Sequence, residues 1–319
     1  MVSAHDLRNY LLTFQESNNA SWHTDPLRAI SGHNIPRDFL GPQAWLLEAD
    51  IKTAWTNWYI DSLINVAAYT HDENKGYAHL YYEIRSALIA RYASIPSDEL
   101  RDVATQLTEI SWGIIEQRRR KGRNAIALDL KEKLWFSAEP NPRCYLCGFL
   151  FGDTARDKFL SRETGGTLKE IEPPLLVDFT RPRSTSRDQL IEIDHVSSVA
   201  RGGSSDESNL KLACGWCNKT KGARSSIYDV GTGSLPPILI NGLGWVNPPA
   251  PFWVLRLVAL RGRCEYPGGC RARLENSELV IAPRYTEGSL NPANCAVYCD
   301  EHDPWRLVRM IGLIPQRNR

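Results

Sequence analysis

The sequence lacks several features that would assign it to other classes of protein. No window of its 319 residues approaches the apolar run that a helix needs to span a bilayer. Its first residues, MVSAHDLR, do not combine a basic segment with an apolar one, so we expect no secretory signal peptide. Cysteine is absent from the first 143 residues, which excludes a disulfide scaffold there. We therefore expect a cytoplasmic protein without a membrane span.

A strong net charge is also lacking, because the formal charge at pH 7 is only +1. The charges are nevertheless distributed unevenly along the chain. Residues 1–110 carry 8 basic and 14 acidic side chains, net −6, and the rest of the chain is net +7. A basic part of this kind fits a polyanionic partner such as nucleic acid. The excess is modest, so charge alone does not predict tight binding.

The cysteines that are present form pairs with the spacing of metal ligands. Cys144 and Cys147 form one C-x-x-C pair, and Cys214 and Cys217 form another. Two such pairs are typical of a structural Zn²⁺ site with four thiolate ligands. Thiolates require reduced cysteines, in agreement with a cytoplasmic setting. We predict that these four residues bind one zinc ion.

The residues between the two pairs suit the hydrolysis of a phosphodiester. A histidine such as His195 has a pKa near neutrality and can deprotonate a water molecule. A divalent cation must neutralise charge on the scissile phosphate, and Mg²⁺ prefers oxygen ligands such as those of Asp194 and Asn218. We expect Asp194 and His195 at the end of a short strand, residues 189–196.

These residues resemble the HNH (ββα-metal) nuclease family. The matching positions are the Asp194-His195 pair, Asn209 and Asn218 at fourteen and twenty-three positions after the histidine, Cys214-x-x-Cys217, the Gly202-Gly203 loop and the closing Lys221-Gly222. The resemblance covers roughly residues 123–224. It implies that His195 is the general base and that Asp194 and Asn218 bind the catalytic cation, Mg²⁺ or another divalent ion. Asn209 would brace the loop between two strands.

Further roles follow from the same resemblance. Lys221 would lie near the scissile phosphate, and we expect Lys219, Lys221 and Arg224 to contact nucleic acid. Glu192 is a candidate for an additional metal ligand or for a residue that supports one. Ser198 stands where the family often has proline, and residues 148–190 form an insertion.

The C-terminal third contains a second set of metal-ligand residues. A shift by 85 positions places Asn209 on Asn294, Cys214 on Cys299 and Cys217 on His302, and it places Asp194 and His195 on Leu279 and Val280. Leucine and valine cannot activate water or hold Mg²⁺. We therefore expect residues 261–319 to form a degenerate HNH-like module that has lost its catalytic residues. An unrelated zinc ribbon is the alternative.

The ligands expected for a second structural zinc are Cys264, Cys270, Cys299 and His302. Cys295 is a rival to Cys270 for this role, although the shift places it at an apolar strand position.

Residues 1–122 show the apolar spacing of helices. We expect helices around residues 7–14, from residue 41 to 63, over residues 77–92, and from Ser97 to a basic end at residues 118–121. That basic end fits either the helix dipole or a contact with DNA, and its position before the nuclease motif favours DNA. Residues 225–260 are rich in glycine and proline, and we expect them to form an ordered, packed connector. A helix over residues 252–261 is expected to lead into the module that follows.

The sequence thus predicts an α+β protein. A helical N-terminal domain (1–122) precedes a zinc-stabilised ββα-metal (treble-clef) HNH module (123–224), a connector and the degenerate module. We expect a metal-dependent endonuclease acting on DNA, with RNA left open. The alternative is a catalytically silent zinc-based nucleic-acid or protein adaptor. The helical domain is expected to contact a regulatory protein or a second copy, in a layout similar to nuclease effector subunits of bacterial antiphage systems.

Overall fold

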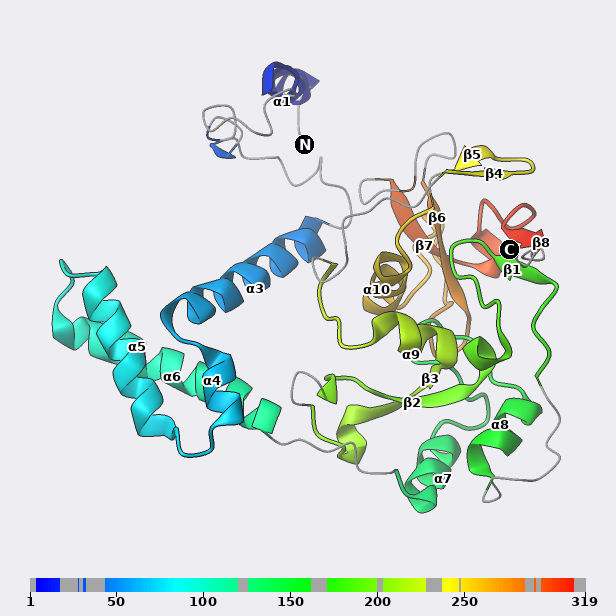
Figure 1. Cartoon of the computed structure of the whole chain (residues 1–319). Coiled ribbons are helices and arrows are strands. Elements are labelled where there is room, and N and C mark those ends of the chain that lie inside the picture. Colours follow the sequence, from blue (N-terminus) through cyan, green and yellow to red (C-terminus); the bar gives the residue numbers. More distant parts are fainter. Residues whose placement is uncertain are drawn as a thin grey trace, which may run out of the picture.

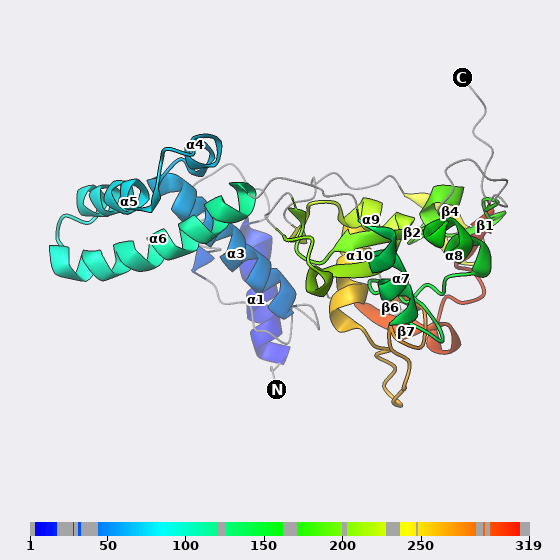
Figure 2. The ribbon, with the colours of Figure 1, turned by 90° about the horizontal axis from the view of Figure 1, so that it is seen from below.

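The structure is a computed structural model of the chain. It describes residues 4–17, 28, 31–32, 44–119, 126–161, 171–199, 203–227, 237–246, 248–284, 290 and 294–312. Figures 1 and 2 show two parts, a helical region at the N-terminal side and a mixed region of short helices and small sheets. In the part of the chain described, no helix is long and apolar enough to cross a membrane. The mixture of helices and small sheets agrees with the predicted α+β class.

The helical region confirms the helices that the apolar spacing predicts. Its elements are α1 (Ala4–Ser17), α3 (Ala44–Leu63), α4 (Val66–His71), α5 (Tyr77–Arg91) and α6 (Ser97–Arg119). The six-residue α4 was not predicted, because a helix this short has no apolar period to read. A side-chain cap marks its start, since the Asn65 carboxamide accepts a hydrogen bond from the Ala68 amide.

The core of the helical region lies between α5 and α6. Leu80, Ile84 and Leu88 of α5 are buried against Leu100, Ala104 and Ile115 of α6. Each large side chain buried in this way stabilises the fold by about 1.5–3 kcal/mol. Val103 and Ile110 also fit the apolar period of α6, but they are 42% and 52% exposed. The helix α6 therefore buries only part of its apolar face.

The basic end of α6 has a structural role at Arg119. Its guanidinium group donates four hydrogen bonds, at 2.7–2.9 Å, to the backbone carbonyls of Tyr69, Asp72 and Lys75. It also lies over the Trp112 ring, 5.1 Å from its centroid. Tyr69 lies in the last turn of α4, whose carbonyls have no partner within the helix, and Asp72 and Lys75 lie in the segment after it, so Arg119 ties the end of α4 and this segment to α6. The guanidinium group of Arg119 is thus used within the fold, and the contact of the basic end with DNA stays a prediction. Residues 120–122 lie outside the described part.

The helix α3 connects the two regions. Near its start, Leu46 is buried in the core of the mixed region. The Asp50 carboxylate accepts from the Ile227 amide at 2.9 Å and pairs with Arg256. Near its end, Ile60 is buried in the core of the helical region instead. One helix thus contributes to both cores.

Within the described residues, the mixed region has one continuous hydrophobic core and four two-stranded antiparallel sheets. Its elements are α7 (Leu128–Phe136), α8 (Asp153–Leu160), β1 (Leu176–Asp178), β2 (Ile191–His195), β3 (Leu210–Cys214), α9 (Gly215–Lys221), β4 (Ile238–Ile240), β5 (Gly244–Val246), α10 (Pro251–Arg261), β6 (Leu279–Pro283), β7 (Cys295–Cys299) and β8 (Met310–Gly312). The sheets pair β1 with β8, β2 with β3, β4 with β5, and β6 with β7. The helix α10 packs against α9 on one side and against β6 and β7 on the other (Figure 1).

The hairpins β2–β3 and β6–β7 can be compared strand by strand, and their register differs from the one predicted. The shift by 85 positions carries β3 onto β7 residue for residue, whereas it carries β2 to three residues before β6. Asp194 pairs with Lys211, and the counterpart of Lys211, Ala296, pairs with Ala282. The counterparts of Asp194 and His195 are therefore Ala282 and Pro283. The assignment to Leu279 and Val280 was wrong, because the loop between the strands is three residues shorter in the second hairpin.

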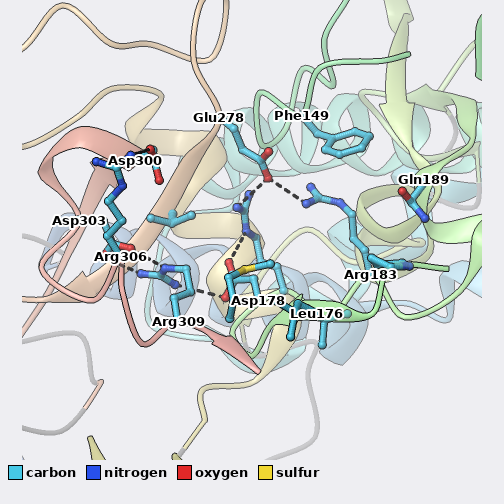
Figure 3. A pocket seen from close by; sticks show the side chains of 15 residues that line it. Phe149, Leu176, Asp178, Arg183, Gln189, Glu278, Asp300, Asp303, Arg306 and Arg309 are labelled. Carbon is cyan, nitrogen blue, oxygen red and sulfur yellow. Dashed lines mark hydrogen bonds and ion pairs between the residues drawn. The ribbon is translucent and has the colours of Figure 1, made fainter. Parts of the chain in front are cut away.

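A cavity of about 400 Å³ lies where the insertion meets the C-terminal residues (Figure 3). Arg181 and Arg183 both donate to the Glu278 carboxylate, at 2.8 and 2.9 Å. On the other side Arg309 donates to Asp178 at 3.3 Å, and both of these residues are buried. Loss of one partner of a buried pair leaves a charge without compensation, at a cost of about 3–5 kcal/mol. These ion pairs therefore hold the insertion against the C-terminal module.

Candidate active site and metal centres

The first cluster of metal-ligand residues comprises Cys144, Cys147, Cys214 and Cys217. Their four sulfur atoms lie within 4.8 Å of one another, and all four side chains are buried. The first pair lies in a turn closed by the Gly148 amide, which donates to the Cys144 carbonyl at 2.8 Å. The second pair ends β3 and begins α9. The predicted grouping is confirmed, and four thiolates are a donor set that fits Zn²⁺.

Arg183 supplies positive charge to this cluster. Its Nη2 atom donates to Cys147 Sγ at 2.8 Å and lies 3.7 Å from Cys214 Sγ. Burial raises the pKa of the Cys147 thiol, but hydrogen bonds within the cluster and the charge of Arg183 lower it to about 7. The thiolate is the form that binds metal. The sequence of residues 148–190 contains several arginines, and no spacing pattern distinguished Arg183 from the others.

The second cluster comprises Cys264, Cys270, Cys299 and His302, whose ligand atoms also lie within 4.8 Å of one another. Cys295 is fully buried on β7 and does not belong to the group. The structure thus decides between Cys270 and Cys295 in favour of Cys270. The His302 ring stacks on Tyr266, with centroids 4.0 Å apart. Three thiols and one imidazole also fit Zn²⁺.

The candidate catalytic residues lie between β2 and α9. The carboxylates of Glu192 and Asp194 share the face of β2 that points to α9. Asn218 Nδ2 donates to Glu192 Oε2 at 2.5 Å, and Lys221 Nζ lies 2.9 Å from Asp194 Oδ2. Lys221 Nζ also donates to the His195 carbonyl at 2.5 Å. Predicted oxygen ligands from a strand and a helix are thereby brought together.

His195 lies at the end of β2, as the sequence predicts. Its Nε2 atom and Ser205 Oγ are 3.2 Å apart, within hydrogen-bond distance. With Asp194, Asn218 and Lys219 it lines an open cleft of about 1020 Å³. The cleft is large enough to admit a phosphodiester to the imidazole.

Asn209 holds the loop that follows His195. Its Oδ1 accepts from the Ser197 amide at 2.8 Å, and its Nδ2 donates to the carbonyls of Ser197 and Ser204 at 3.0 and 2.7 Å. A Cβ atom at Gly203 would lie 1.7 Å from the Ser197 carbonyl oxygen, so only glycine fits in this turn. The amide group of Asn209 thus fixes the backbone directly after the histidine.

Tyr145 is a site residue that the sequence did not indicate. Its hydroxyl donates to Asp194 Oδ2 at 2.5 Å, although the two residues are 49 positions apart. Burial and the nearby negative charge of Asp194 raise the pKa of Tyr145 well above its usual range, so the phenol remains a donor. Because Tyr145 lies between Cys144 and Cys147, the first metal cluster helps to orient the Asp194 carboxylate.

The basic residues near the cleft differ in part from those expected. Lys219 lines the cleft, and Lys221 faces Asp194 and His195. Arg224 does not line it, since its guanidinium group donates to the Thr220 carbonyl and lies 5.7 Å from the centroid of the Phe252 ring. Two residues that the sequence did not indicate, Lys131 of α7 and Arg187, complete the basic lining.

Comparison with known proteins agrees with this site. Residues 180–224 match the family model described as HNH endonuclease. This segment contains β2, the loop held by Asn209, β3 and α9. It supports a hydrolase of the nuclease type that uses a divalent metal. Neither the curated proteins nor the solved structures provide a match to this chain.

Proposed function

We propose that this protein is a metal-dependent HNH endonuclease that hydrolyses phosphodiester bonds in DNA. The observation that carries the proposal is the convergence of Asp194, His195 and Asn218 on one cleft inside the segment that matches the family. In this proposal residues 123–224 form a treble-clef module with structural zinc, and the second hairpin belongs to a degenerate copy of it.

The donor atoms fit a hard divalent cation. Asp194 offers a carboxylate that is only 5% exposed and already interacts with the positive charge of Lys221. Because Asn218 Nδ2 is used by Glu192, its carbonyl oxygen is the atom left for a cation. When bound, the cation neutralises charge on the phosphate and on the leaving oxygen.

The chain's own residues divide the other tasks. The His195 imidazole accepts the proton of the attacking water. The amide of Asn209 holds the following loop, and Tyr145 holds the carboxylate of Asp194. Lys131, Arg187 and Lys219 supply positive charge to the cleft wall, where phosphates of the substrate would lie.

Cleavage of nucleic acid tests this function directly. Incubation of the zinc-containing protein with supercoiled plasmid should give nicked and linear DNA in Mg²⁺, Mn²⁺ or Ni²⁺, and no product in EDTA. A parallel incubation with a long RNA distinguishes the two substrates, and cleavage of RNA alone would replace DNA in the proposal. Absence of cleavage of both substrates with all three metals would contradict it and favour the silent adaptor.

The helical region is proposed to carry a protein contact, with a regulator or a second copy. Its support is the exposure of large apolar side chains on α3, where Ile51 and Trp55 are 53% and 61% exposed. A nuclease regulated through such a contact suits a role in antiphage defence, which we include in the proposal. Replacing both residues by serine should lower the molar mass of the assembly in light scattering. An unchanged molar mass would exclude this face of α3 as the contact between two copies and leave the regulator as its partner.

A further inference from the structure

The two metal clusters are built on knuckles of the same design. The first knuckle (residues 143–150) is closed by a bridge between Arg143 and Leu150, and the second knuckle (residues 263–273) by a bridge between Arg263 and Arg273. In each knuckle the amide of the first cysteine donates a hydrogen bond across the turn. Cys144 donates to the Phe149 carbonyl, and Cys264 donates to the Ala272 carbonyl. The two turns are closed in the same way, although the second is three residues longer, and they carry different side chains at the closing bridge.

The second knuckle places two like charges opposite each other. Arg263 and Arg273 are direct partners in an antiparallel bridge, where the first knuckle has arginine opposite leucine. Residues at such positions have Cβ atoms about 4.5–5.5 Å apart, and like charges there are destabilising. Arg271, two residues before Arg273, adds a third exposed guanidinium group. The second knuckle therefore concentrates positive charge, and the repulsion between its paired arginines destabilises it.

No acidic side chain of the described residues forms an ion pair with these three arginines. Nearby Glu265 is occupied by Arg261 at 3.1 Å and by Arg284 at 3.4 Å. Asp300 is occupied by Arg306 at 3.0 Å. Glu275, two residues after Arg273, and Glu301 are exposed.

The arginines stand on a rigid support. The knuckle contains Cys264 and Cys270, two residues of the second metal cluster, and Tyr266 stacks on a third, His302, at an angle of 12° between the rings. Guanidinium groups on a fixed turn lose little entropy on binding. Their fork geometry suits the paired oxygens of a phosphate.

The position of the knuckle relates it to the nuclease cleft. It follows α10 directly, and the contact of Arg224 with Phe252 places the start of α10 beside the end of α9. The eleven residues of α10 span about 16 Å. Since a duplex rises about 3.4 Å per base pair, this length corresponds to about five base pairs. This length is shorter than one turn of a duplex, about 34 Å.

We propose that Arg263, Arg271 and Arg273 of the second knuckle bind the phosphate backbone of nucleic acid, outside the cleft that carries His195. The inference rests on the proposed function, because the partner is the substrate of that nuclease. It assigns to the C-terminal module a binding task that requires none of the catalytic residues it lacks.

Binding by a catalytically silenced protein tests this. In a His195→Ala background, the triple substitution Arg263→Gln, Arg271→Gln and Arg273→Gln should weaken binding of a labelled 30-base-pair DNA duplex about tenfold near 0.1 M salt. The slope of log K against log salt should become shallower by about 2 to 3, because each lost phosphate contact removes about 0.9. The corresponding triple lysine variant should retain most of the slope. An RNA duplex of the same length identifies which nucleic acid uses the surface.

The control removes the same charge elsewhere. Lys52→Gln, Arg91→Gln and Arg101→Gln change three exposed residues of the helical region and should leave affinity and slope as in the parent. Zinc content by elemental analysis verifies the fold of the knuckle variant, and the helical signal in circular dichroism verifies that of the control. Equal affinity of the knuckle variant and its parent at every salt concentration would overturn the inference alone. A parent that binds neither DNA nor RNA would overturn the inference together with the proposed function.

Discussion

Replacement of His195 by alanine is expected to abolish cleavage while the protein remains folded and keeps its zinc. A general base contributes about 10²- to 10⁴-fold to a rate, so the single-turnover rate on plasmid should fall by at least the lower figure. The imidazole has no structural ligand role, because it belongs to neither of the two metal clusters. Ser198→Ala is the matched control, since Ser198 lines the same cleft and is assigned no proton transfer.

Two further variants distinguish the loss of a general base from the loss of a cation ligand. Asp194→Asn and Asn218→Ala should lose activity through the cation, so part of it should return at high metal concentration, whereas His195→Ala should not respond. Asparagine is preferred at position 194 because an alanine would leave the Tyr145 hydroxyl and the Lys221 ammonium without their acceptor. Undiminished metal-dependent cleavage by pure His195→Ala protein would contradict both the site and the function.

Loss of a single ligand of the first cluster should prevent folding. Structural Zn²⁺ contributes about 10–16 kcal/mol in small zinc domains, which equals or exceeds the total stability of a typical protein, about 5–15 kcal/mol. Cys144→Ala or Cys214→Ala should therefore yield insoluble protein. Cys214 ends β3 directly before α9, so its loss also releases the helix that carries Asn218. Soluble yield and elemental analysis measure the effect.

Cys295→Ala is the matched control, because Cys295 is equally buried but lies outside both clusters. It should cost only about 1 kcal/mol and leave two zinc ions per chain. Native protein containing one zinc or none would contradict the assignment of two structural sites. A soluble Cys144→Ala protein with normal zinc content would contradict the ligand set itself.

Relations between residues close in the chain were predictable. The C-x-x-C pairs and the offsets of Asn209 and Asn218 from His195 describe a hairpin followed by a helix, and this local unit is what the structure contains. The positions of its metal-ligand residues depend on one turn and on the start of one helix. The geometry of each depends on only a few consecutive residues. The apolar period likewise located α3, α5 and α6, because a helix repeats over many residues.

Predictions failed where the spacing of residues in the sequence was used to infer how distant segments pack. The shift by 85 positions allowed no gap, so it missed the three-residue difference in loop length between the two hairpins. With this difference included, the counterparts of Asp194 and His195 are Ala282 and Pro283. For Arg119 the sequence shows the charge but not the partners of the guanidinium group. The carbonyls that it binds, at residues 69–75, lie more than forty positions away.

The chemical groups on which the proposed function rests can be read from the sequence: two sets of candidate zinc ligands, a candidate histidine base and oxygen donors for a cation. The tertiary structure alone decided which residues support that chemistry. Tyr145 reaches Asp194 across 49 positions, and Arg183 compensates thiolates from both C-x-x-C pairs while pairing with Glu278, 95 positions away. The physical reason is that a hydrogen bond or ion pair depends on distance in space. Between residues this far apart in the chain, that distance is set by how the whole core packs.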